Sequence, residues 1–535
     1  MLRSCVLGVV MLLNAEPLLC AAAEDSLLGQ ARREISNGNF PLAELALRSY
    51  SESHGETAYA SYLMGVALAG ERKWTESDEY LRKALKEDEN LDVALRMLAM
   101  NAFEAHDFDR ASKYLSLFLD KRPIDPLAHA TAAQIALTER SCALAVDHFR
   151  KATSLVGGSP RLQLLLAQAL MCSNQAQQAG SVLAGIRSKD ASIVFQEALL
   201  LTHTGHLREA LVRLKQVREV YPDRAAVQFN IALVHFQMQD YSDAIADLNQ
   251  MTEAGLGDAD VYSLLGDSYQ HVGKEQEALQ AFQRAISLAP GDLQPAVDLL
   301  SLYVDLKDTN RGLELANVAL NQHPAAYELF ALRAALLSLR NEPALAEADY
   351  RRALELSPNT EWLYTGLAAL LMFDEHRPKD SEELLRSHLD EFTGYYSYFL
   401  YSEALRRLGL DRDIEMQRKS IECLKRSIHL NPMFAPARAS LGRLYQVQGD
   451  WSRALLEYRK ATELDPSDAG SYFHLYRIYT HQGDLPKARE MLASASRLNA
   501  NERARRLTGN GQERTGGARG EALYVAQGHQ SLHRE

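Results

Sequence analysis

Cysteine, tryptophan and long apolar runs are scarce in this chain of 535 residues. Five cysteines are too few for disulfides to be the main support of a fold of this length. Beyond Leu13 no apolar run approaches the roughly 20 residues of a membrane-spanning helix, so we expect no later span. Positive charge is also in deficit, because 58 Lys and Arg face 70 Asp and Glu, and this balance argues against nucleic acid as a partner.

Sequence motifs of well-known enzyme classes are missing as well. The chain holds no Gly-x-Ser-x-Gly, no His-Glu-x-x-His and no phosphate-binding loop that ends in Gly-Lys-Ser/Thr. His203 and His206 flank a predicted turn at Gly205, and two histidines are too few for a zinc site. We therefore expect no enzymatic activity, no cofactor and no metal.

Residues 1–23 have the pattern of a secretory signal peptide. Cys5–Leu13 is an uninterrupted apolar stretch, and Ala21–Ala23 supplies small residues before Glu24. We expect cleavage after Ala23 and a periplasmic or secreted mature chain; the alternative is an uncleaved N-terminal anchor or a buried helix. Lipid attachment at Cys20 is disfavoured. Bacterial lipoprotein signals have small residues directly before the cysteine, whereas the bulky Leu19 precedes Cys20 here.

The mature chain would keep three cysteines, Cys142, Cys172 and Cys423, so at least one thiol is unpaired within it. Cys142 begins one predicted helix and Cys172 ends the next, which places both at the same edge of a helical stack. A disulfide between them is geometrically conceivable. We expect two separately buried thiols instead.

A ladder of small and aromatic residues repeats about every 34 residues, roughly fourteen times. The clearest copies contain the following residues: Gly266, Tyr269, Ala278, Phe282, Ala285 and Pro290 in one, and Gly442, Tyr445, Ala454, Ala461 and Pro466 in another. The spacings of three, four and seven are those of helix faces, and a polar break follows Gly273. Each unit is therefore predicted to be a first helix, a tight turn and an antiparallel second helix.

The small residues of the ladder indicate where paired helices approach closely. Gly266 and Ala278 are predicted to meet at the crossing, beside Phe282 and Tyr269. Because no unit can bury its apolar stripe alone, neighbouring units must stack. The sequence thus predicts an all-α solenoid.

This ladder resembles the tetratricopeptide repeat family. The resemblance implies an α-α superhelix of antiparallel helix pairs, with a concave groove lined mainly by first helices, and protein or peptide partners. Family members that grip a peptide's terminal carboxylate use lysines and asparagines in this groove. Tyr62, Val66 and Arg96 stand at such positions here, so we do not expect that clamp.

The register divides the chain into four expected parts after the signal peptide. We expect an N-terminal array at 24–373, an irregular joint at 374–413, a C-terminal array at 414–500 and a disordered tail at 507–535. In the joint, Asp380 falls where the second helix should have its alanine. The joint is either a place of extra helix packing or a hinge or docking site.

Aromatic and polar residues at positions that face the implied groove are the candidate binding site. They are Tyr59, Tyr62, Arg96, Met100, Phe195, Phe229, Asn230, Phe236 and Phe473, with Arg443, Arg477, Asp267 and Gln270 among the interspersed polar residues. The alternative is that many of them simply pack against neighbouring helices. We expect a non-enzymatic, exported interaction scaffold; alternatives are the binding subunit of an envelope glycosyltransferase or polysaccharide-export system, or a self-assembling structural protein. The sequence leaves the oligomeric state open.

Overall fold

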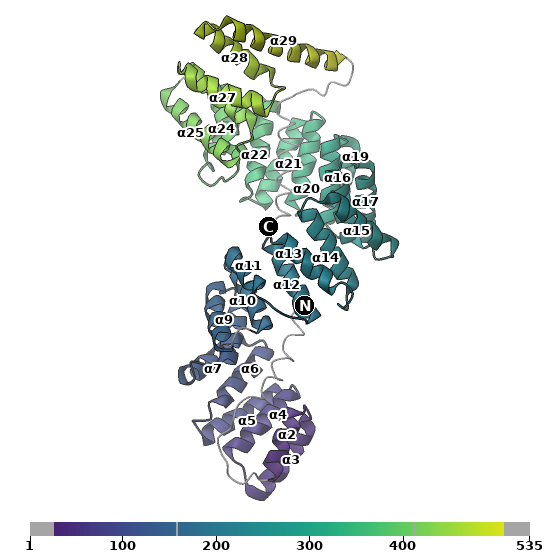
Figure 1. Ribbon diagram of the computed structural model, residues 1–535, viewed down its shortest axis with the longest axis vertical. Coiled ribbons are helices and arrows are strands. Elements are labelled where there is room, and N and C mark those ends of the chain that lie inside the picture. Colours follow the sequence, from purple (N-terminus) through teal and green to yellow (C-terminus); the bar gives the residue numbers. More distant parts are fainter. Residues whose placement is uncertain (1–25, 157–158, 410–412, 508–535) are drawn as a thin grey trace. The chain divides into compact units, whose positions relative to one another are not determined.

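The computed structural model describes residues 26–507 except 157–158 and 410–412. These residues form 28 α-helices and one short π-helix, with no strand among them (Figure 1). The helices follow one another as fourteen pairs, which confirms the predicted all-α repeat. The expected signal peptide at 1–23, Cys20 and all of the expected tail beyond Leu507 lie outside the described residues.

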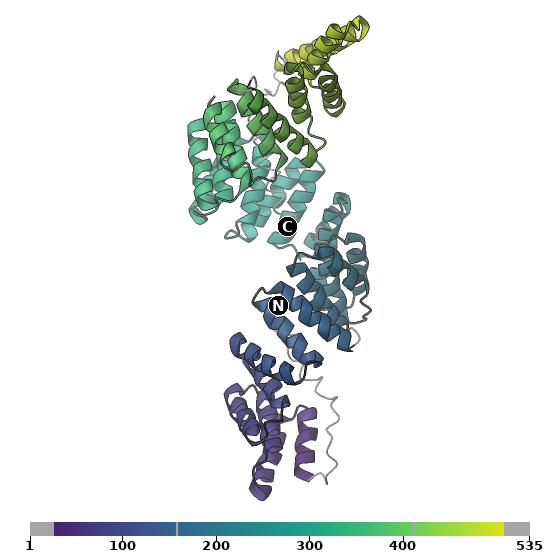
Figure 2. The same cartoon turned by 90° about the vertical axis from the view of Figure 1, so that its left-hand side faces the viewer.

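The chain divides into two compact units, with the boundary between Asp247 and Leu248 inside helix α15. Helices of the first unit are paired in chain order (Figure 2). The pairs are α2 (Ser26–Ser36) with α3 (Phe40–His54), α4 (Ala58–Gly70) with α5 (Trp74–Glu87), α6 (Val93–Glu104) with α7 (Phe108–Lys121), α8 (Pro126–Thr138) with α9 (Cys142–Val156), α10 (Pro160–Cys172) with α11 (Ala176–Ala184), α12 (Ala191–His203) with α13 (Leu207–Val217), and α14 (Arg224–Gln237) with α15 (Tyr241–Glu253).

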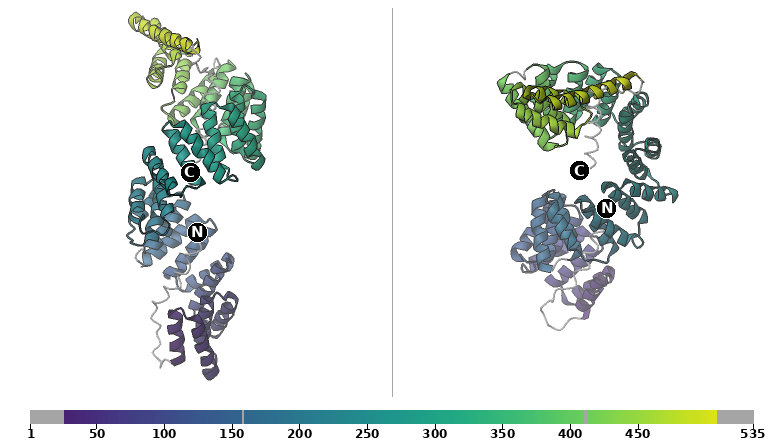
Figure 3. Two further views of the ribbon diagram at one scale, coloured as in Figure 1. Left: turned by 90° about the vertical axis from the view of Figure 1, so that its right-hand side faces the viewer. Right: turned by 45° about the horizontal axis from the view of Figure 1, so that its top comes forward.

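The second unit continues the same pattern of paired helices (Figure 3). The π-helix η1 (Leu370–Asp374) is inserted after α22. The pairs are α16 (Ala259–His271) with α17 (Glu275–Leu288), α18 (Gln294–Leu306) with α19 (Thr309–Gln322), α20 (Tyr327–Leu339) with α21 (Pro343–Leu356), α22 (Glu361–Ala369) with α23 (Pro378–Arg386), α24 (Tyr395–Arg407) with α25 (Ile414–Leu430), α26 (Ala435–Val447) with α27 (Trp451–Leu464), and α28 (Ala469–Gln482) with α29 (Leu485–Leu507).

The turn inside every pair contains one residue in the left-handed backbone region, and these residues mark the register. They are Gly38, Arg72, His106, Arg140, Asn174, Gly205, Gln239, Gly273, Lys307, Asn341, His376, Gly409, Gly449 and Gly483. Most steps between them are 34 residues, but the step from Asn174 to Gly205 is 31. The step from Gly409 to Gly449 is 40, so the largest expansion follows α24 and includes the 17-residue helix α25.

The irregular stretch expected at 374–413 follows directly on the π-helix η1, which is an irregularity distinct from the expansion after α24. A π-turn accommodates one extra residue, and the step from Asn341 to His376 is accordingly 35. Ser381, rather than Asp380, therefore takes the place of the small second-helix residue. Its side chain is fully buried and its Oγ donates to the carbonyl of Ala368 at 2.9 Å, so the assignment to Asp380 was wrong by one residue.

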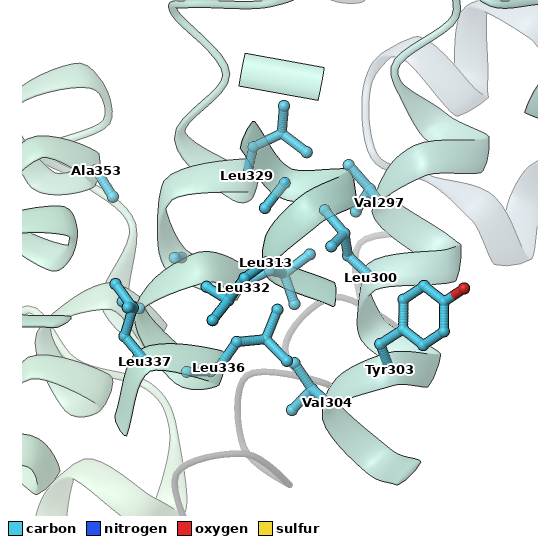
Figure 4. Packing of buried hydrophobic residues seen from close by; sticks show 14 of the residues in the cluster. Val297, Leu300, Tyr303, Val304, Leu313, Leu329, Leu332, Leu336, Leu337 and Ala353 are labelled. Carbon is cyan, nitrogen blue, oxygen red and sulfur yellow. The ribbon is translucent and has the colours of Figure 1, made fainter. Parts of the chain in front are cut away.

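The predicted close packing is present in the second unit. A Cβ built on Gly266 would lie 2.6 Å from the ring of Phe282, and one on Gly442 would lie 3.1 Å from the ring of Tyr458. Buried side chains of successive pairs then join into extended cores, as Figure 4 shows for α18 to α21. Each repeat thus relies on its neighbours for burial.

Cys142 and Cys172 form a disulfide, with their Cα atoms 5.5 Å apart. Cys142 is the first residue of α9 and Cys172 the last of α10, so the ends of two adjacent antiparallel helices meet there. Cys172 is exposed and Cys142 half-buried. The expectation of two separately buried thiols was therefore wrong; within residues 26–507, where the structure describes them, only Cys423 is a buried free thiol.

Candidate functional site

The first helices of each unit lie closer together than the second helices. Successive first helices contact one another in both units. Examples are the pairs α4 and α6, α10 and α12, and α16 and α18. Among the described residues, successive second helices do not approach one another to the same extent. Each unit therefore curves with its first helices on the inside, and we call this side the inner face.

Three of the nine candidate residues are buried in helix packing. Arg96 pairs with Asp125, Nη1 to Oδ2 at 2.9 Å. Met100 lies in the core, with 9% of its surface exposed. Phe195 stacks on Tyr221 with ring centroids 4.3 Å apart. For these three residues the alternative interpretation therefore holds, because their side chains pack against neighbouring helices.

Five further candidates of the first unit are half-buried on the inner face. They are Tyr59, Tyr62, Phe229, Asn230 and Phe236. The rings of Tyr59 and Tyr62 are stacked with centroids 6.3 Å apart. The amide of Asn230 donates to the carbonyl of Ala226 in its own helix at 2.7 Å, so that donor is already engaged. The aromatic rings are the part of this set that can contact a partner.

Phe473 differs from the other eight candidates because it is 47% exposed. It lies on α28, in the second unit, with its ring centroid 5.8 Å from that of Tyr476. An exposed phenylalanine next to a second aromatic ring is a typical anchor point in protein interfaces.

Carboxylates gather on α16 and α18 of the second unit. Burial and the neighbouring charge of Asp298 raise the pKa of Asp267 well above its usual value. Asp305 lies at the surface, but desolvation by the surrounding protein raises its pKa to about 6, although the hydrogen bond from Gln270 opposes this rise. This acidic strip was visible in the sequence only as scattered polar positions, because the side chains come from different helices.

A pocket of about 230 Å³ opens on the inner face where α24, α26 and α28 follow one another. We call it the C-terminal pocket. Its polar lining includes Glu403 and Arg406 of α24, Ser440 and Arg443 of α26, and Asp468 and His474 at or in α28. Of these polar residues the sequence pattern indicated only Arg443, because nothing in a helix pattern shows which side chains of three repeats converge. Arg477, also predicted, is not part of the lining.

Both carboxylates of the C-terminal pocket are engaged within the protein. Glu403 accepts from Arg406 Nε at 2.7 Å and from Ser440 Oγ at 2.8 Å. Asp468 caps α28, where Oδ1 accepts from the backbone N–H of Gly470 at 3.0 Å. Within this lining, the two carboxylates balance the charges of Arg406 and Arg443.

His474 lies in this lining, close to charged side chains. Its ring stacks on Tyr458 with centroids 4.8 Å apart, and its Nδ1 lies 2.9 Å from Gln446 Oε1. Burial, Arg477 and Arg443 lower the pKa of His474, whereas Asp468 opposes them. The imidazole is therefore neutral near pH 7.

Residues 26–507, without their two gaps, contain no group of three or more His, Cys, Asp or Glu placed to hold a metal ion. No helix in this part of the chain combines the length and the apolar character that crossing a membrane requires.

Among known proteins, the chain is similar to the human protein O-mannosyl-transferase TMTC1, with 22% identity over 232 residues, covering 43% of this chain and 22% of that protein. It is also similar to the TPR repeat-containing protein MJ1428 of Methanocaldococcus jannaschii, with 21% identity over 295 residues, covering 55% and 48%. The chain thus spans less than half the length of either relative.

Solved structures with a similar arrangement include the APC/C hetero-tetramer Cut9-Hcn1 and yeast Tom70. The first shares 14% identity at a TM-score of 0.39, covering 93% of this chain and 96% of that chain. The second shares 17% identity at a TM-score of 0.39, covering 84% and 97%.

Three family models described as tetratricopeptide repeat match the sequence. Their matches cover 28–91 and 96–179, 201–267 and 445–510, and 259–292. These segments together include more than half of the chain. The chain therefore belongs to the tetratricopeptide repeat family.

Proposed function

We propose that this protein is a non-enzymatic scaffold that binds segments of partner proteins on its inner face. The observation that carries the proposal is the set of half-buried and exposed aromatic rings on first helices, from Tyr59 in the first unit to Phe473 in the second. Tetratricopeptide repeat folds support protein–protein interaction, and aromatic side chains supply much of the binding free energy of such interfaces.

Pull-down of partners from the native extract tests the scaffold. Tyr62→Ala and Phe473→Ala, made separately, are expected to lower recovery of the same partners by about tenfold or more. Leu345→Ala is the matched control, since Leu345 is 57% exposed but lies on the second helix α21. Equal recovery by folded Tyr62→Ala, Phe473→Ala and wild-type chains would contradict the proposal.

We also propose that the protein acts outside the cytoplasm, after removal of residues 1–23. The signal-like pattern of these residues supports this, and so does the Cys142–Cys172 disulfide, because disulfides persist in oxidising compartments. Mass spectrometry of the protein from envelope fractions of its native host should find Glu24 as the first residue. A chain that keeps Met1 and stays with the cytoplasmic fraction would overturn the proposal.

A second candidate is the binding subunit of an envelope glycosyltransferase system. The match to a protein O-mannosyl-transferase favours it, although this chain covers only 22% of that protein. Co-purification of a glycosyltransferase with the wild-type chain, lost in Tyr62→Ala or Phe473→Ala, would select this candidate over a scaffold of other partners.

A further inference from the structure

The acidic strip of the second unit consists of Asp267 on α16 and of Asp298 and Asp305 on α18. Asp298 and Asp305 are seven residues apart, so two helical turns bring them to one side of α18. Gln270 of α16 donates from Nε2 to Asp305 Oδ2 at 3.0 Å, so this side of α18 faces α16. Asp267 lies one turn before Gln270, and the charge of Asp298 acts on its carboxyl group. Two first helices thus bring three carboxyl groups together on the inner face.

The described part of the chain supplies no counter-charge to Asp267 or Asp305. The pKa of Asp267 is raised by burial and by Asp298, and that of Asp305 is raised to about 6 by desolvation against the hydrogen bond from Gln270. No lysine, arginine or histidine of the described residues forms an ion pair with either carboxyl group. The amide of Gln270 donates a hydrogen bond but carries no charge. The strip therefore keeps negative charge that an outside cation could offset.

A buried hydroxyl group lies on the same side of α18. Ser301 follows Asp298 by three residues and precedes Asp305 by four, so the three side chains share one helix face. Only 7% of the surface of Ser301 is exposed, yet its hydroxyl group has no hydrogen-bond partner among the described residues. Ser268, buried on α16, instead donates to the carbonyl of Leu264 at 2.7 Å. Because buried hydroxyl groups are normally hydrogen-bonded, Ser301 indicates a place for a group from outside the chain.

The oxygens around Ser301 favour a cation that brings its own hydrogen-bond donors. Carboxylate and hydroxyl oxygens accept hydrogen bonds, and the amide donor of Gln270 is already used by Asp305. A metal ion is disfavoured, because no three His, Cys, Asp or Glu side chains of the described residues are placed to hold one. A guanidinium group offers five donors in one plane and is more weakly hydrated than an ammonium group. Arginine is therefore the side chain that matches the strip.

We propose that the acidic strip binds an arginine side chain of a partner polypeptide that lies along the inner face. The guanidinium group donates to Asp267 and Asp298, and Ser301 accepts a further hydrogen bond. A cation beside both carboxyl groups removes the repulsion between them, which adds to its own attraction. This inference rests on the proposed scaffold function and specifies its partner as a positively charged segment, which complements the net charge of −12 of this chain.

Fluorescence anisotropy with the full mature chain tests the proposal. The probes are labelled heptapeptide libraries of uncharged residues, acetylated and amidated at their ends, with arginine, citrulline or lysine fixed at the centre. Citrulline has nearly the shape of arginine but is neutral. The arginine library is expected to bind at least about tenfold more tightly than the citrulline library. It should also bind about threefold or more tightly than the lysine library, which cannot make the same planar set of hydrogen bonds.

Variants connect this binding to the acidic strip. Asp267→Asn and Asp298→Asn keep the size of each side chain but remove its charge, and each is expected to weaken binding of the arginine library about tenfold. Ser301→Ala should weaken it about threefold. Glu314→Gln is the matched control, since Glu314 is an exposed carboxylate on the second helix α19, and it should leave the binding unchanged. Circular dichroism confirms that each variant is folded.

Four results would overturn the inference. They are equal binding of the arginine and citrulline libraries, equally tight binding of the lysine library, unchanged arginine binding by folded Asp267→Asn and Asp298→Asn chains, and equally tight binding of a single acetylated and amidated arginine, which would indicate a site for small cations. None of them would by itself contradict the scaffold. If wild-type protein still captures partners that Tyr62→Ala loses, the scaffold stands and only the chemistry of the acidic strip is wrong.

Discussion

Glycine at the helix crossing is required by the space that an aromatic ring occupies. A Cβ on Gly266 would lie 2.6 Å from the ring of Phe282, which is fully buried and cannot swing away. Gly266→Ala is therefore expected to destabilise its repeat by about 1–3 kcal/mol. Gly291→Ala is the control, since nothing lies within 4 Å of its added Cβ.

Urea unfolding followed by circular dichroism measures both variants. Gly442→Ala should fall between them, because its Cβ would lie 3.1 Å from the ring of Tyr458. If Gly266→Ala were as stable as Gly291→Ala, close packing would not explain the glycine.

Asp305 makes a second residue-scale prediction, concerning pH. Desolvation by the surrounding protein raises its pKa from 3.8 to about 6, so between these values the folded chain holds a proton that the unfolded chain has lost. The resulting contribution to stability is fully present below pH 3.8 and is lost as the pH rises through about 6.

Asp305→Asn keeps an acceptor for Gln270 but removes this titration. Its urea midpoint is expected to fall less than that of the wild-type chain between pH 4.5 and about 7. The same slope in both chains would contradict the assignment to Asp305.

For the candidate binding residues, the sequence pattern predicted the helix on which each residue lies but not the exposure of its side chain. Periodicity correctly placed Tyr59, Phe229 and Phe473 on first helices. It could not distinguish exposed Phe473 from buried Phe195, because Phe195 is covered by Tyr221, which precedes the next first helix. The exposure of a side chain depends on which side chains of the neighbouring repeat cover it, and that is decided only when the repeats are stacked.

At the scale of elements, the π-helix explains the irregular register that begins near Asp374. The sequence indicated the location of this irregularity but not its cause. One inserted residue would rotate the following helix by about 100° if the α-helical turn simply continued. The wider turn of Leu370–Asp374 absorbs that residue, and Ser381 keeps the position that Ser77 has in α5. Both serines donate to a first-helix carbonyl across the crossing.

The Cys142–Cys172 disulfide gives the element-scale prediction. It joins two helix ends that are 30 residues apart in the sequence, so in the chain-entropy description it stabilises the folded state by about 3–4 kcal/mol. Replacing both cysteines by serine should speed hydrogen exchange in α9 and α10. A reducing agent should reproduce this effect in the wild-type chain.

Non-reducing peptide mapping checks the linkage directly and should find Cys142 bound to Cys172. Cys423 should resist alkylation in the folded chain, because burial raises its pKa to about 12 and little thiolate forms at neutral pH. Recovery of Cys142 and Cys172 as free thiols from protein kept under oxidising conditions would contradict the disulfide.

At the scale of the whole molecule, stability is expected to be local. Each repeat contacts mainly its neighbours, so the loss of one core side chain should affect only nearby pairs. Tyr350 is fully buried in α21, and Tyr350→Ala is expected to cost about 3–5 kcal/mol in its own part of the second unit.

Hydrogen exchange measured by mass spectrometry tests this locality. Exchange should speed up from α19 to α23 and stay unchanged in α27 to α29, while Leu345→Ala on the exposed side of α21 should change neither. Uniform acceleration throughout the second unit would indicate one cooperative core instead of a sum of neighbouring contacts.

The sequence by itself determined the helix pairs, their 34-residue register and the three-residue contraction before Ala191, because these follow from the periodic placement of small, apolar and turn residues. The tertiary structure alone decided the disulfide, the one-residue shift at Ser381 and the convergence of Arg406, Arg443 and His474. The physical reason is distance along the chain. A pattern within one helix is set by its own residues, whereas these features join side chains about 13 to 70 residues apart, whose meeting depends on how stacked helices are placed.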